Sequence, residues 1–111
     1  MVVGASESDW KVFRKLREPA LERYCERVLD EVDRISSDAS RSHHERYLEV
    51  FQLLGDRNEM LARAFDDPRR SQMLRQLAAM HALHLLEAND LARFDPEIQE
   101  RIAAMAELFS T

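Results

Sequence analysis

An apolar residue recurs every three or four positions along the first third of the chain, which is the spacing of one face of an α-helix. The series runs without a break through Trp10, Phe13, Leu16, Ala20, Leu21, Tyr24, Cys25, Val28, Leu29, Val32 and Ile35. Pro19 lies inside the series and removes one backbone donor. We therefore expect one long helix that is capped at Ser8 and is kinked, or else split, at Pro19.

Three further helices are expected after a serine-rich linker at 36–42. Ser42 and Glu45 have the spacing of a capping box, so a helix should cover 43–65, with Gly55 as a weak point. Its buried side should carry Tyr47, Leu48, Phe51, Leu54, Leu61, Ala64 and Phe65. Two Asp-Pro pairs, at 67–68 and 95–96, each predict a helix start. They give a third helix from Pro68 to about Leu86 and a last helix that buries Ile98, Ile102, Met105 and Phe109.

The fold class follows from these elements and from the scarcity of turn residues. The 111 residues include only two glycines and three prolines, whereas sheets and tight turns use more of both. We predict an all-α protein, an antiparallel bundle of four main helices with a short turn before the last one. Residues 1–7 should form a flexible tail and 8–111 a single helical domain.

Charge and composition narrow the classes of partner. The net charge is −5, which disfavours nucleic-acid binding because phosphate contacts need clustered basic residues. The small basic patch of Lys11, Arg14, Lys15 and Arg17 is expected to be a solvated face. No apolar run approaches the length of a membrane span. A single cysteine, Cys25, favours a reducing, cytoplasmic location, and at a core position it should be inert packing.

Two histidines give the sharpest hypothesis about a site. His81 and His84 fall in the apolar sector of the expected third helix and should point inward, where each imidazole needs a hydrogen-bond partner. Tyr24, Tyr47 and Asn58 are the candidate partners. Three interpretations remain open: a structural pair, a pair at a dimer interface, or a pocket for a small ligand.

Metal and catalytic sites receive little support from the sequence. Two histidines are too few for zinc, and the Glu-x-x-His pairs of di-iron bundles are lacking around His81 and His84. His43 and His44 are adjacent, so on a helix they diverge by about 100° and cannot easily share an ion. We find no nucleophile triad and no phosphate-binding glycine loop, and we expect no cofactor.

The third helix is apolar on more than one face. Ala79, Ala82, Leu83 and Leu86 lie opposite its main apolar face, which suggests that a partner covers them. A second copy in a two-fold dimer is the simplest partner, and another protein is the other candidate. The sequence thus favours a non-enzymatic, cytoplasmic protein-interaction module, with a small-ligand-binding or minor enzymatic protein as the alternative.

Overall fold

The computed structural model describes residues 6–110 and shows an all-α protein. Its elements in chain order are α1 (Glu7–Ser36), α2 (His43–Phe65), the 3₁₀ turn η1 (Arg70–Gln72), α3 (Met73–Ala82), α4 (Ala88–Leu91) and α5 (Pro96–Ser110).

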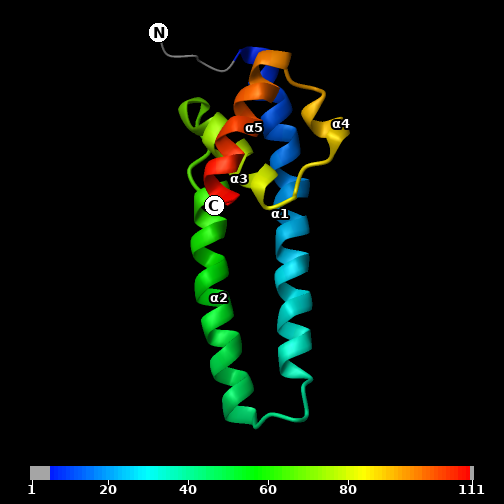
Figure 1. Ribbon diagram of the computed structural model, residues 1–111, viewed down its shortest axis with the longest axis vertical. Coiled ribbons are helices and arrows are strands. Elements are labelled where there is room, and N and C mark those ends of the chain that lie inside the picture. The colour runs from blue at the N-terminus through cyan, green and yellow to red at the C-terminus, as the bar shows by residue number, and fades with distance from the viewer. Residues whose placement is uncertain (1–5, 111) are drawn as a thin grey trace.

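A long hairpin dominates the shape of the molecule. α1 and α2 run antiparallel along its longest dimension, 55 Å, whereas the other two dimensions are 24 and 23 Å (Figure 1). The shorter elements α3, α4 and α5 gather around the end of the hairpin that holds the start of α1 and the end of α2 (Figure 1). We call this the upper end and the rest the distal half, which comprises residues 25–36 and 43–58. The three shorter helices thus lie beside the upper end only, and the predicted antiparallel bundle of four main helices is not confirmed.

α1 is one continuous helix that passes through Pro19. The exposed position of Pro19 leaves its ring in solvent, and the helical phase continues to Ser36. The helix begins at Glu7, two residues earlier than a cap at Ser8 would allow, because the Ser6 hydroxyl accepts the Asp9 amide at 3.0 Å. Glu7, which we had expected in the tail, forms an ion pair with Arg70.

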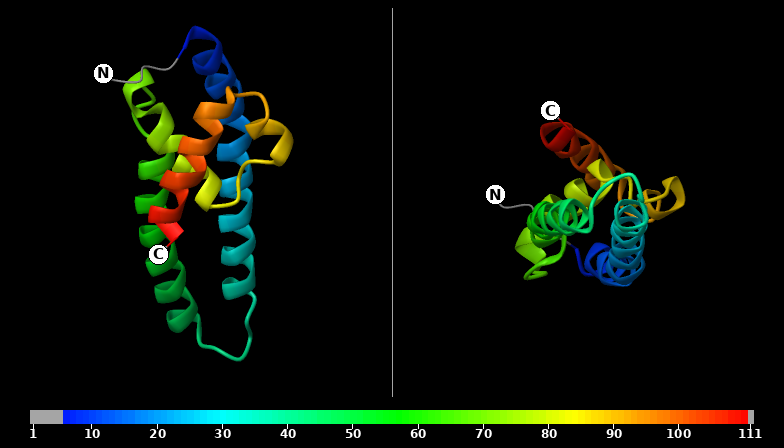
Figure 2. Two further views of the ribbon diagram at one scale, coloured as in Figure 1. Left: turned by 45° about the horizontal axis from the view of Figure 1, so that its top comes forward. Right: turned by 90° about the horizontal axis from the view of Figure 1, so that it is seen from below.

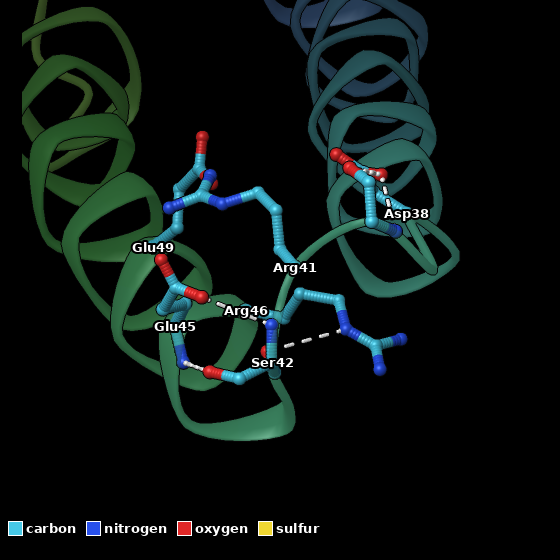
Figure 3. Close-up of polar contacts among 7 residues, drawn as sticks. Asp38, Arg41, Ser42, Glu45, Arg46 and Glu49 are labelled. Atoms are coloured by element: carbon cyan, nitrogen blue, oxygen red, sulfur yellow. Dashed lines mark hydrogen bonds and ion pairs between the residues drawn. The ribbon is translucent and has the colours of Figure 1, made fainter.

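The start of α2 confirms the capping box. The Ser42 hydroxyl accepts the Glu45 amide at 3.1 Å, and the Glu45 carboxylate accepts the Ser42 amide at 3.0 Å (Figure 3). Arg41, also in the loop, forms an ion pair with Glu49 one turn into α2 (Figure 3). The Arg46 guanidinium reaches back to the Ser36 carbonyl at 2.6 Å. These contacts fix the turn between the two long helices.

The hydrophobic core lies at the upper end. Its largest fully buried side chains are Phe13, Phe65, Met73, Leu77, Met80, Leu85 and Ile102, which come from α1, α2, α3, α5 and the loop after α3. The Tyr24 and Phe65 rings also meet there, with centroids 6.2 Å apart. The last buried residue of α1 is Val28, and Val32, one turn further, is half-buried against the core.

The third helix is shorter than predicted at both ends. Asp67 does not cap it, because Asp67 has a left-handed backbone (φ 52°) and its carboxylate binds Arg69. The chain turns once as η1, and α3 begins only at Met73. A Gln76 side chain satisfies the Asp66 carbonyl at 2.5 Å, which ties α3 to the end of α2.

α3 ends at Ala82 in a Schellman motif rather than continuing to Leu86. The Leu85 amide donates to the Met80 carbonyl and the His84 amide to the His81 carbonyl, at 3.0 and 2.9 Å. His84 occupies the left-handed position (φ 58°) where glycine is usual. Buried Leu85 then packs into the core after the turn.

Two arginines of α1 hold the loop after α3. Arg23 donates to the Leu85 carbonyl at 2.6 Å and lies 3.7 Å from the Asp90 carboxylate. Arg27 donates to the carbonyls of Leu83 and His84, both at 2.7 Å. Because the carbonyls of Leu83 and His84 lie at the C-terminal end of α3, where the helix dipole is negative, the positive charge of Arg27 there is also favourable.

The last two helices follow the sequence signals in part. The expected turn contains the one-turn helix α4, capped by Glu87 with Asp90, and α5 begins at Pro96 as predicted. α5 buries Ile98, Ile102 and Ala106. The prediction for its last turns was wrong, since Phe109 is 42% exposed and Met105 is only half-buried.

Candidate functional site

The two histidines do not form an inward-facing pair. His84 is exposed, because the left-handed turn that ends α3 directs this position out of the core. His81 is half-buried in the last turn of α3. The periodicity of the sequence placed both on one face only on the assumption that the helix continued to Leu86.

Tyr24 is the one member of the predicted pocket that is buried. Its hydroxyl donates to the Arg57 carbonyl at 2.8 Å, joining α1 to α2. The Arg57 guanidinium in turn donates to the Glu31 carboxylate at 3.0 Å, and this hydrogen bond raises the arginine pKa. Burial raises the pKa of the Tyr24 hydroxyl. This set of contacts is a structural clamp between the long helices.

Neither Tyr47 nor Asn58 forms part of a buried pocket, although Asn58 directly follows Arg57, whose carbonyl accepts the Tyr24 hydrogen bond. Both are exposed on α2, and Tyr47 keeps 67% of its surface in solvent near the distal turn. The five residues of the predicted pocket are therefore not brought together. The open groove beside Tyr24, of about 260 Å³, is lined instead by Arg27, Glu31, Arg57, Met60 and other neighbours.

The face of α3 predicted to bind a partner is largely covered within the chain. Ala79 is 5% exposed and belongs to the core. Leu83 and Leu86 are half-buried and pack against that core, and Ala82 is half-buried as well. The surplus of apolar residues on α3 is explained by its position between the hairpin and α5, so it needs no second chain.

Among the described residues, most of the large apolar side chains that remain exposed lie on α2, whereas α5 exposes Leu108 and Phe109 near its end, by 77% and 42%. Tyr47, Leu48, Phe51 and Leu54 are 67%, 46%, 69% and 40% exposed, although the sequence placed them in the core. We call these four residues the α2 patch. They lie in the distal half, beyond the reach of α3 and α5 (Figure 1). On α1, Leu29 is 61% exposed in the same half of the hairpin.

The views in Figure 2 show how the rest of the molecule leaves this half of the hairpin uncovered. Seen from below, α4 and α5 stand on one side of the plane that contains the two long helices. In the distal half, a shallow groove between α1 and α2 is lined by charged residues, among them Glu31, Arg34, Arg41 and Glu49. At about 100° per residue, the α2 patch points away from these groove residues of α2.

The basic patch near the start of α1 forms a second surface feature. Lys11, Arg14 and Lys15 are exposed and line an open groove of about 890 Å³ together with Trp10. The Arg70 guanidinium lies over the Trp10 ring, 5.9 Å from its centroid. Arg17 turns inward instead and donates to the Phe65 carbonyl at 2.6 Å. The groove is therefore a solvated, charged face beside a structural arginine.

The described residues form neither a metal-binding cluster nor a membrane-spanning helix. Among residues 6–110, no group of three or more His, Cys, Asp or Glu side chains is arranged to hold a metal ion. Within the same range, no helix is both long and apolar enough to cross a membrane. Cys25 is a half-buried free thiol on α1.

Comparisons with protein-family models, with curated proteins and with solved structures find no match for this chain.

Proposed function

We propose that this protein is a non-enzymatic interaction module that acts by protein contact through the α2 patch. The observation that carries the proposal is the exposure of four large apolar side chains on one helix, next to a core that is otherwise well filled. A contiguous apolar patch on a soluble protein is a recurrent mark of an interaction surface. Cytoplasmic location, with Cys25 kept reduced, belongs to the same proposal.

The size of the patch supports this proposal. An aromatic side chain offers roughly 200 Å². Tyr47 and Phe51, each about two-thirds exposed, thus leave about 270 Å² on the surface before Leu48 and Leu54 are added. Covering such a surface is favourable at about 25 cal/mol per Å².

A second copy of the chain is the first partner to expect, and another protein with an apolar helical face is the next. Two hairpins packed on each other would bring four long helices together in the distal half. Ala82 at the end of α3, and Leu83 and Leu86 in the loop after it, would keep their places in either case.

A photocrosslinking experiment tests the proposal in the cells that make the protein. A benzophenone amino acid replaces Phe51, and a matched control carries it at Gln52, which is exposed but lines the charged groove. We expect a protein adduct from position 51 and little or none from position 52. Equal yields at both positions, or no adduct at either, would contradict a contact through the α2 patch.

A further inference from the structure

The apolar residues of α2 follow the spacing of a coiled-coil seam. Steps of four, three, four, three and four residues connect Tyr47, Phe51, Leu54, Asn58, Leu61 and Phe65, of which Asn58 alone is not apolar or aromatic. This alternation is the a and d pattern of a heptad repeat, in which one narrow face of a helix meets a partner helix. Asn58 occupies an a position, where a single polar residue commonly fixes the register of a pair.

Within residues 6–110, only the upper end of this seam packs against other elements. Phe65 is 1% exposed and Leu61 packs against the core, whereas Phe51 is 69% exposed. The seam therefore continues for more than two turns beyond the core, over the stretch from Tyr47 to Asn58. A neighbouring helix is needed there, and the described chain supplies none on that face.

We infer that the missing helix is α2 of a second copy, which runs in the opposite direction. This inference rests on the proposed function and names its partner. In an antiparallel pair, a positions of one helix face d positions of the other. About a two-fold axis midway between Phe51 and Leu54, Phe51 faces the Leu54 of the second copy, and Tyr47 faces its Asn58.

The residue types fit these layers. The two central layers pair Phe51 with Leu54 and are wholly apolar, as the middle of an interface should be. The two outer layers pair Tyr47 with Asn58, so the phenol hydroxyl can donate to the carboxamide oxygen of the other chain. The only polar side chains of the exposed seam thus partner each other, which gives the Tyr47 hydroxyl an acceptor on burial.

Gly55 is explained by the same pairing. A glycine inside a helix costs about 1 kcal/mol relative to alanine. Within one chain nothing demands it, since its φ is not positive and a Cβ there would meet nothing within 4 Å. Leu48 and Gly55 lie on the same flank of the seam, and the antiparallel register brings the Leu48 of one chain beside the Gly55 of the other. The missing side chain leaves space for the leucine.

The shape of the molecule also favours opposite directions. The upper end is wider than the distal half because α3, α4 and α5 lie there (Figures 1 and 2). An antiparallel pair places the two upper ends at opposite ends of the dimer, whereas a parallel pair would bring them to the same level. Stable interfaces bury about 800 Å² from each partner. The α2 patch forms the centre of that area, with Leu29 and the flanks of the hairpin as its rim.

Sedimentation equilibrium tests the partner. We expect a dimer of the 13.0 kDa chain at roughly 50 µM. Phe51→Glu should raise the dimer dissociation constant roughly 100-fold or more, because each dimer would bury two carboxylates. Gln52→Glu, at an exposed position about 100° around α2 from Phe51, should leave the dimer intact. Helical circular dichroism on diluted samples of both variants controls for folding, which an exposed position should hardly affect.

Cysteine crosslinking tests the register, in a Cys25→Ser background. A chain that carries both Tyr47→Cys and Asn58→Cys should form a covalent dimer on mild oxidation, because each cysteine faces the other position of the second copy. These two positions lie three turns apart on one helix and cannot bridge within a chain. Neither single variant should crosslink. A disulfide dimer of the Asn58→Cys variant alone would overturn the antiparallel register.

The inference and the proposed function can fail separately. A wild-type protein that stays monomeric at roughly 50 µM while benzophenone at position 51 captures a different protein in cells would overturn the second copy as partner and keep the contact surface. A monomer with no adduct from position 51 would overturn both.

Discussion

A single backbone angle decides where α3 ends. His84 adopts the left-handed conformation, which costs a non-glycine residue about 1–2 kcal/mol, and its exposed side chain makes no compensating core contact. We expect His84→Gly to raise the free energy of unfolding by about 0.5–1 kcal/mol, because the strain relieved outweighs the extra entropy that glycine gives the unfolded chain. Urea denaturation measures the change.

A neighbouring glycine substitution provides the control. Ala82 lies in the last turn of α3 with ordinary helical geometry, so Ala82→Gly should lower the free energy of unfolding by about 1 kcal/mol. A loss of stability in His84→Gly as large as that in the control would show that the left-handed residue is not strained.

Among the elements, α2 shows which sequence signals were sufficient to predict where a helix begins and ends. Its bounds were predicted from Ser42 with Glu45 at the start and the Asp-Pro pair after the end, since caps are local and act within a few residues. The start of α5 at Pro96 was predicted for the same reason. The predicted ends of α3 were wrong, because left-handed Asp67 and His84 depend on how the chain turns between packed elements, which the local pattern did not indicate.

The candidate site shows that helical periodicity alone does not predict which apolar residues are buried. Periodicity marked Tyr47, Leu48, Phe51 and Leu54 as apolar positions on one face of α2, and that much was right. It could not indicate which part of a 23-residue helix the core would cover. The predicted site at His81 and His84 depended on a longer α3, so it was lost with the end of that helix. The four–three spacing through Asn58 was the available signal for the seam.

The cap of α2 gives a pH-dependent prediction. The Ser42 amide and hydroxyl lower the pKa of Glu45 below its usual 4.5. A lowered folded-state pKa means that the ionised cap stabilises the fold above the unfolded value and that this contribution is lost as the pH falls through the folded value. Glu45→Gln keeps the shape and loses the charge. The difference in Tm between wild type and Glu45→Gln should be largest near neutral pH and shrink below pH 4.5.

An exposed glutamate elsewhere on α2 provides the control for Glu45→Gln. Glu59 is exposed and lies outside the cap, so the difference in Tm between wild type and Glu59→Gln should vary less with pH. A difference for Glu45→Gln that stays constant between neutral and acidic pH would exclude a charged cap.

At the scale of the whole molecule, stability should be unevenly distributed along the hairpin. The upper end holds the fully buried side chains, whereas the distal half has two helices and the exposed α2 patch. Few buried contacts mean that the distal half opens locally at lower free energy.

If opening of the distal half proceeds from the monomer, pairing of two copies protects it by mass action, and the monomer fraction falls with the square root of concentration. Raising the concentration about 100-fold in the dimer range should slow amide exchange in residues 43–58 about tenfold, and leave the amides of Leu77 and Ile102 nearly unchanged. Hydrogen exchange followed by mass spectrometry measures both regions in one sample, and Phe51→Glu should exchange rapidly in the distal half at every concentration. Uniform protection that ignores concentration would mean that a single hairpin is stable along its full length without a second copy.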